Sequence, residues 1–178
     1  LLLNKLFKNK ILSFVGIIFL ITYPRIFAHS FYNSKDIVFM SLFIMTAYFS
    51  YSYLLKRKLK NFLLLCFFSA CSINLRTIGF VLPLMVYLNI LFESYNLRNF
   101  KNKDIYLIPL FIIIFLYLIW PFLWENPVSN FYYVLTWFKN IPITIDVFYL
   151  GQDINAKNVP WHYLFVWIAV TTPSYLLF

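Results

Sequence analysis

The sequence is poor in charged residues and in glycine. Only 12% of its 178 residues are Asp, Glu, Lys or Arg, whereas 62% are hydrophobic, which leaves too little polar surface for a water-soluble fold of this length. Its 3 glycines argue against a loop-rich fold. These low proportions exclude a soluble globular domain, and we expect a chain embedded in a lipid bilayer.

The motifs of soluble enzymes are also missing from the sequence. It has no glycine-rich phosphate loop, no His/Cys zinc spacing and no Gly-x-Ser-x-Gly elbow. Cys66 and Cys71 lie within an apolar run, so we interpret them as small buried hydrophobes rather than as a disulfide or a metal pair. The sequence therefore predicts neither a metal site nor another cofactor.

Long apolar runs separated by basic segments make up most of the chain. A membrane span needs about 20 mostly apolar residues, and its backbone groups must be satisfied within helices. We expect an all-α fold, a polytopic transmembrane helix bundle with short external juxtamembrane helices. The expected spans are 11–23, 37–55, 62–74, 78–92, 105–121 and 161–178. Because the chain begins at Leu1 and ends within an apolar run, we interpret residues 1–178 as part of one domain, truncated at both ends.

Basic residues set the expected orientation of the bundle. Most of the 15 Lys and Arg residues fall in segments 5–10, 56–60 and 98–103, which the positive-inside rule places in the cytoplasm. We interpret these clusters as orientation signals in contact with anionic lipid headgroups, not as nucleic-acid patches. The segment 24–36 and the loop 124–160 then face the other side of the membrane.

The external segment 24–36 contains the first candidate site. If it is helical, Arg25 and His29 lie on its polar face, as in a short helix lying flat on the membrane. Asp36 opens the following span, where a carboxylate either stabilises the start of a helix or serves as an acid of the site. The nearby Arg25, His29 and Lys35 favour the second interpretation.

Arg76 is the second candidate. It lies near membrane depth without an acidic neighbour in the sequence, so its partner has to come from elsewhere. A guanidinium suits a phosphate at the outer headgroup level, because its planar fork donates two parallel hydrogen bonds. The alternative is an arginine that extends to the surface from the end of a helix.

The third candidate is the end of the long external loop. Trp161 and Tyr163 are suited to bind sugar rings, and are equally suited to anchor the chain at the membrane interface, which we favour. His162 fits either a site residue or a histidine that bonds to the backbone. The sequence leaves both interpretations of this region open.

Three segments in this order resemble the polytopic GT-C glycosyltransferases, which include protein O-mannosyltransferases and lipid A aminoarabinose transferases. The segments are 24–36, 75–83 and the group 149–151, 160–163 and 172–173. The resemblance implies an inverting transfer from a polyprenyl-phosphate-linked sugar donor to a lipid, protein or glycan acceptor on the outer side of the membrane. The sequence is rich in Lys, Asn, Ile and Phe, which suggests a bacterial inner membrane.

The resemblance also assigns roles to residues. Asp36 matches a second acid of the family, and Arg76 matches the arginine that binds the donor phosphate. Arg25, His29, Lys35, Trp161, His162 and Tyr163 are the remaining substrate-binding candidates. The main catalytic base of the family lies in a first external loop that we expect before Leu1, so these 178 residues alone are expected to be inactive.

Two other functions remain open. A flippase or transporter of polyprenyl-linked sugars also needs an arginine for phosphate, but would place polar residues near the membrane midplane. A structural subunit would need no site at all. The polar residues gather at the outer loops, which favours an enzyme.

Overall fold

The computed structural model describes residues 2–96, 103–139 and 146–172. Helices dominate these residues and only one small hairpin is present among them, so the expected all-α fold class is confirmed. The elements are α1 (Leu2–Phe7), α2 (Lys10–Thr22), α3 (Pro24–Tyr32), α4 (Ser34–Leu55), α5 (Leu59–Leu75), η1 (Thr77–Phe80), α6 (Val81–Asn96), α7 (Asp104–Ile119), η2 (Pro121–Leu123), α8 (Pro127–Lys139), β1 (Asp146–Tyr149), β2 (Gln152–Asn155), η3 (Ala156–Asn158) and α9 (Tyr163–Thr171). The basic residues Arg98 and Lys101, and residues 173–178 of the expected last span, lie outside the described residues.

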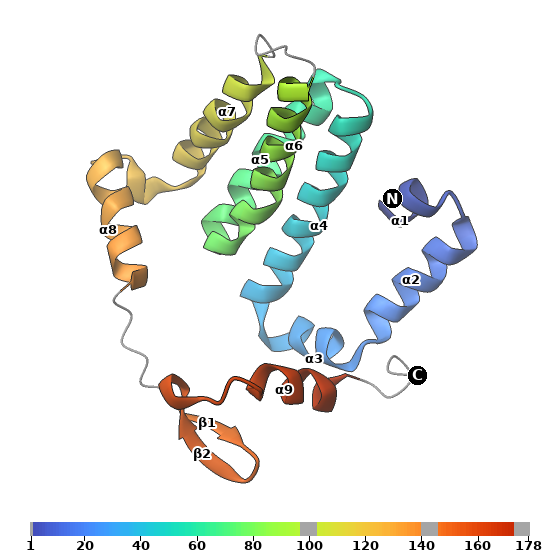
Figure 1. Cartoon of the computed structure of the whole chain (residues 1–178), viewed down its shortest axis with the longest axis vertical. Coiled ribbons are helices and arrows are strands. Elements are labelled where there is room, and N and C mark those ends of the chain that lie inside the picture. The colour runs from blue at the N-terminus through green and yellow to red at the C-terminus, as the bar shows by residue number, and fades with distance from the viewer. Residues whose placement is uncertain (1, 97–102, 140–145, 173–178) are drawn as a thin grey trace.

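Helices α4 to α7 form a bundle that contains the core (Figure 1). Helix α5 packs against both α4 and α7. The core consists of apolar and aromatic side chains from all four helices: Tyr53, Phe62, Leu65, Cys66, Val86, Ile90, Ile105, Ile108 and Ile112. Cys66 is fully buried in it, and both cysteines are free thiols.

Small side chains bring α4 and α5 close together. Thr46 on α4 and Ser69 and Ser72 on α5 are fully buried, and small residues allow the backbones of two helices to approach. Thr46 Oγ1 donates to the Leu42 carbonyl oxygen at 2.9 Å, and Ser72 Oγ donates to that of Ser69 at 2.9 Å. The two helices run in opposite directions, so the end of α5 lies beside the start of α4.

Two helices among the described residues, α4 and the combined η1–α6 helix Thr77–Asn96, are long and apolar enough to cross a membrane. The pair α2 and α3 makes a third candidate, bent by 58° where Pro24 starts α3. Helices α5 and α7 are apolar but shorter. The protein is therefore an integral membrane protein, whereas the bounds of its individual spans remain predictions.

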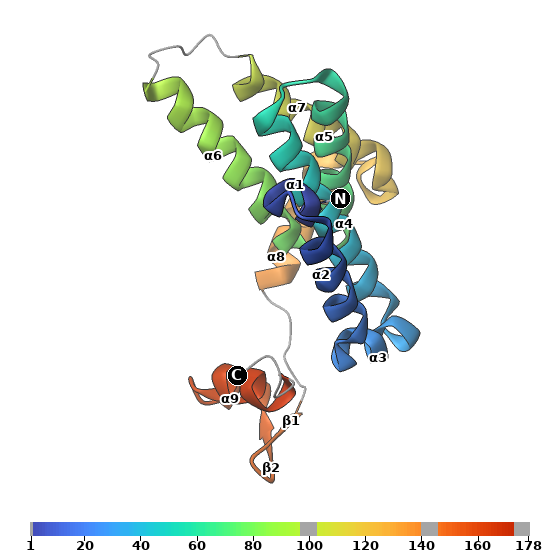
Figure 2. The same cartoon turned by 90° about the vertical axis from the view of Figure 1, so that its right-hand side faces the viewer.

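Residues 124–139 and 146–160 have more regular structure than the sequence suggested. Helix α8 begins at Pro127, whose fixed φ suits the first position of a helix. Strands β1 and β2 pair antiparallel around Leu150 and Gly151, which both have positive φ, 50° and 86°. Two such residues form the tight turn of a hairpin. Leu is uncommon in such a turn, so the turn was hard to predict from the sequence. Figure 2 shows the hairpin and α9 beyond one end of the bundle.

Arg57 joins three helices at the other end of the bundle. Its guanidinium, next to the end of α4, forms ion pairs with Glu93 of α6 and Asp104 of α7. The Arg57 Cζ also lies 5.7 Å from the centre of the Tyr53 ring. From sequence we interpreted segment 56–60 as an orientation signal only. This network was not predicted because both acids lie far from Arg57 in the sequence.

Candidate active site

The site begins at the junction of α3 and α4, where Asn33 caps α4. Asn33 Oδ1 accepts a hydrogen bond from the Asp36 backbone N–H at 3.2 Å. The same side chain donates through Nδ2 to Asp36 Oδ2 at 2.8 Å. Asp36 is therefore a residue in the first turn of α4 and a carboxylate held in one orientation, whereas its role as an acid of the site stays a prediction.

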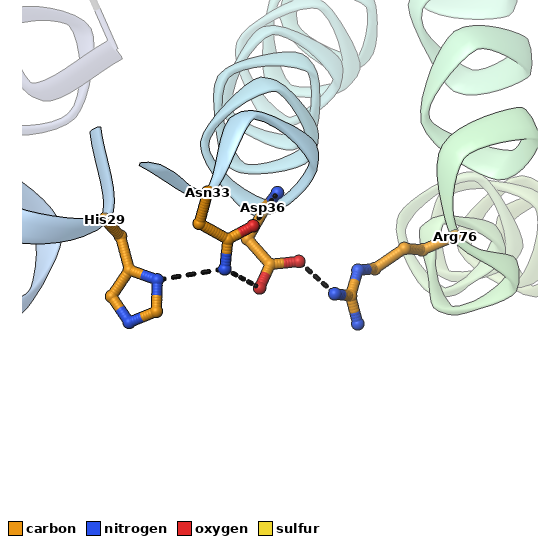
Figure 3. Close-up of polar contacts among 4 residues, drawn as sticks. All are labelled: His29, Asn33, Asp36 and Arg76. Atoms are coloured by element: carbon orange, nitrogen blue, oxygen red, sulfur yellow. Dashed lines mark hydrogen bonds and ion pairs between the residues drawn. The ribbon is translucent and has the colours of Figure 1, made fainter. Parts of the chain in front are cut away.

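His29 extends this network from α3. Its Nδ1 lies 2.9 Å from Asn33 Nδ2 (Figure 3). Because the Asn33 amide nitrogen is the donor, His29 Nδ1 accepts, and the ring proton is on Nε2. Segment 24–32 is helical, as considered from the sequence, and α3 turns its histidine toward the start of α4.

Arg76 supplies the positive charge of the site. It follows the last residue of α5, has extended backbone angles, and forms an ion pair with Asp36 Oδ1 through Nη2 (Figure 3). Its other terminal nitrogen points away from Asp36 in the same view. Arg76 has no acidic neighbour in the sequence, and its acidic partner, Asp36, lies 40 positions earlier.

The turn after Arg76 depends on Gly79. A Cβ atom at this position would lie 2.5 Å from the backbone carbonyl carbon of Ser72, 2.6 Å from its oxygen and 2.8 Å from the Ile73 nitrogen. These are backbone atoms, so a larger residue forces η1 away from α5. Gly79 N–H also donates to the Arg76 carbonyl oxygen at 2.8 Å, which ties the turn to the arginine.

Two cavities adjoin the ion pair. The first has a volume of about 180 Å³ and is lined by Arg25, Ile26, His29, Asp36, Ile37 and Met40. The second has a volume of about 410 Å³ and is lined by Ile73, Asn74, Leu75, Arg76, Thr77, Trp120, Tyr133, Val134 and Trp137. Asp36 faces the first cavity and Arg76 the second, so the ion pair connects the two.

Arg25 and Lys35, two further candidates, differ in their surroundings. Arg25 lines the cavity of Asp36, and its Cζ lies 3.7 Å from the centre of the Trp167 ring in α9. Tyr23 Oη also donates to the Thr171 carbonyl oxygen at 3.5 Å, so α9 lies against the start of α3. Lys35 is exposed on the first turn of α4.

Trp161, His162 and Tyr163 form a different cluster within the described residues. The rings of His162 and Tyr163 lie 5.9 and 5.1 Å from the ring of Tyr149, which is buried. Trp161 is 84% exposed. The contacts of these rings tie the hairpin to the start of α9, whereas α9 approaches α3 through its other half, so their part in binding a substrate stays a prediction.

No group of three or more His, Cys, Asp or Glu side chains that could hold a metal ion is found in the part of the chain that the structure describes.

The family model of the dolichyl-phosphate-mannose-protein mannosyltransferases matches residues 1–123. The chain belongs to this family. Neither a curated protein nor a solved structure matches the chain.

Membership in the mannosyltransferase family makes the protein a membrane glycosyltransferase of the kind that uses polyprenyl-phosphate sugar donors. The matched residues include Asp36, Arg76 and Trp120. The later residues that line the second cavity, Tyr133 and Trp137, lie beyond the match. None of these three aromatic residues was among the site residues predicted from the sequence. The spacing of Tyr133 and Trp137, four residues apart on one helix face, was the available signal.

Proposed function

We propose that this mannosyltransferase family member moves a sugar from a polyprenyl-phosphate donor to a hydroxyl group of a lipid, protein or glycan. The ion pair between Asp36 and Arg76 is the observation that carries the proposal. It places a carboxylate next to the one type of side chain that binds phosphate with a planar fork. The reaction requires removal of a proton, to which the carboxylate contributes, and stabilisation of a leaving phosphate, which the guanidinium provides.

We assign the transfer to the outer face of a bacterial inner membrane. Asp36 lies in the first turn of α4, and segment 56–60 follows its last residue. A helix of 22 residues is roughly 33 Å long, about the thickness of the hydrocarbon core. The positive-inside rule places segment 56–60 in the cytoplasm, which supports an outer, periplasmic position for Asp36.

In the proposed reaction, the oxygen of the acceptor hydroxyl forms a bond with the anomeric carbon of the donor sugar. The bond from that carbon to the phosphate oxygen breaks, and its electron pair stays on the phosphate. The hydroxyl proton is taken up by the acids of the site, Asp36 together with the main base that the family resemblance places in an earlier external loop. Arg76 holds the phosphate as its negative charge grows, through the N–H groups that do not bond to Asp36.

Three variants of the full protein in membranes test this proposal. Asp36→Asn keeps the shape of the side chain but cannot take up the proton, so we expect transfer to fall about 10²-fold or more with donor binding retained. Arg76→Ala should weaken donor binding as well as transfer. Lys60→Ala is the control, because it removes an exposed charge at the opposite end of the bundle and should leave transfer and donor binding unchanged.

The assay uses radiolabelled polyprenyl-phosphate sugars and measures transfer and binding separately. Unchanged transfer in both Asp36→Asn and Arg76→Ala would contradict the assignment of the site and favour a structural subunit. A wild-type protein that moves labelled lipid across the bilayer but transfers no sugar would instead be a flippase.

A further inference from the structure

The cavity beside Arg76 combines three aromatic rings with polar groups. Trp120 follows the last residue of α7, and Tyr133 and Trp137 lie four residues apart on α8. Tyr133 is 59% exposed and Trp137 is 53% exposed, so much of the surface of both side chains is open rather than packed in the core. Asn74 at the end of α5, Arg76, and Thr77 at the start of η1 line the same cavity.

The combination suits a sugar better than a hydrocarbon chain. A pyranose ring has apolar C–H faces that pack on aromatic rings, and hydroxyl groups around its edge that need hydrogen-bond partners. A volume of about 410 Å³ falls within the range of roughly 300–1,000 Å³ that is usual for small-ligand sites. By contrast, the adjoining cavity that shares Ile73 is lined by side chains such as Phe80, Ile112 and Phe131, which suit a lipid chain.

We propose that the cavity formed by Trp120, Tyr133 and Trp137 binds the sugar ring of the donor. This inference rests on the proposed function, because Arg76 at the edge of the cavity has to hold the donor phosphate. The sugar is bonded directly to that phosphate, so a phosphate at Arg76 leaves the sugar within reach of the three rings. Asp36, paired with Arg76, then lies on the side from which the acceptor hydroxyl arrives.

The test compares two probes that differ only in the sugar, polyprenyl-phosphate mannose and sugar-free polyprenyl phosphate. Trp137→Leu keeps an apolar side chain but removes the aromatic face, so we expect it to weaken binding of the mannose-bearing probe roughly three- to tenfold. Binding of the sugar-free probe should stay unchanged. Trp137→Phe keeps an aromatic face and should retain most of the binding, which separates stacking from simple filling of space.

Tyr132→Ala is the matched control. Tyr132 is the neighbour of Tyr133 on α8, is 68% exposed, and lines a different cavity. Its replacement should leave the binding of both probes unchanged. The melting temperature of every variant in detergent identifies any variant that fails to fold. If a Trp137 variant fails to fold, Tyr133→Phe and Tyr133→Leu replace it as the aromatic and aliphatic pair.

The outcomes distinguish the inference from the proposed function. Equal loss of both probes in Trp137→Leu, or no loss of either, would overturn the sugar site while leaving the role of Arg76 intact. Unchanged binding of sugar-free polyprenyl phosphate in Arg76→Ala would overturn the phosphate site itself. A wild-type protein that binds neither probe would overturn both.

Discussion

Asn33 caps helix α4 and also contacts two side chains of the site. Its Oδ1 accepts from the Asp36 backbone N–H, which caps α4, and its Nδ2 contacts both the Asp36 carboxylate and the His29 ring. The amide is the one side chain among the described residues that touches both of these groups at this junction. A substitution here can therefore separate the stability of the helix from the orientation of the site.

Asn33→Ser should separate these two contributions. Serine retains a good capping oxygen, so the free energy of unfolding should change by only a few tenths of a kcal/mol. It cannot donate to Asp36 and contact His29 together, so we expect transfer to fall roughly tenfold. Asn33→Ala also loses the cap and should lower stability by about 1 kcal/mol. Melting temperature and transfer rate are measured side by side, and wild-type transfer in the serine variant would show that the amide contacts do not matter for activity.

Single residues of the site were partly predictable from the sequence. Arg76 was expected because a charge near membrane depth is costly, and Asp36 because Arg25, His29 and Lys35 lie near it in the sequence. Their pairing was not, since the two are 40 positions apart and only the antiparallel packing of α4 and α5 brings them together. Trp161, His162 and Tyr163 were chosen for their residue type and for the resemblance of segment 160–163. Neither reason could show that the rings of His162 and Tyr163 also pack on Tyr149.

At the scale of elements, the turn between α5 and α6 determines where Arg76 lies. The tight contact of Gly79 with the backbone of Ser72 leaves no space for a side chain. Any movement of η1 moves the carbonyl to which Gly79 bonds, and that carbonyl belongs to Arg76. The position of the guanidinium thus depends on a glycine three residues away.

Gly79→Ala should weaken donor binding and lower the melting temperature, because η1 has to shift away from α5. Gly16→Ala is the matched control: its Cβ would meet Leu3 Cδ1 at 2.6 Å, which is the end of a flexible side chain. We expect Gly16→Ala to keep wild-type binding. Binding of sugar-free polyprenyl phosphate and thermal melting check both variants. Equal behaviour of the two would mean that the contact with Ser72 has no role in placing Arg76.

The opposite ends of the helices depend on Arg57. Its side chain is 33% exposed and pairs with two carboxylates, so we expect Arg57→Ala to lower the stability of the bundle by about 1 kcal/mol, after allowance for solvent screening. Lys58→Ala, an exposed neighbour, is the control. Thermal unfolding in detergent at low and high salt measures the difference. An Arg57→Ala variant as stable as Lys58→Ala at low salt would contradict the role of this network.

Elements were predicted well where apolar runs are long, and poorly elsewhere. The break at Arg76 and the helix from Pro24 follow from polar residues and proline within apolar sequence. Helix α8 and the hairpin were not predictable in this way, because segment 124–160 mixes aromatic and polar residues without a regular period. The hairpin turn also has Leu150 at a position where Asn or Asp is usual.

For the whole molecule, the proposed orientation makes a direct prediction. Ser30 on α3 and Lys58 after α4 are both exposed and lie near opposite ends of α4. In a background with Cys66→Ala and Cys71→Ala, Ser30→Cys should react with a membrane-impermeant maleimide added to intact spheroplasts. Lys58→Cys should react only after the membrane is permeabilised. Labelling of both from outside, or of Lys58→Cys alone, would overturn the outer position of the site.

The ion pair of Asp36 and Arg76 also has a consequence for biosynthesis. In the proposed orientation each charge lies at the outer end of its helix, and this end has to cross the hydrocarbon core when the helix inserts, which is unfavourable for an unpaired charge. Asp36 leaves the ribosome 40 residues before Arg76. Insertion of α4 is therefore delayed until α5 is made, or α4 inserts with an unpaired charge. The cost falls when the two helices move into lipid together as one hairpin, so the residues assigned to catalysis also favour the joint insertion of their own helices.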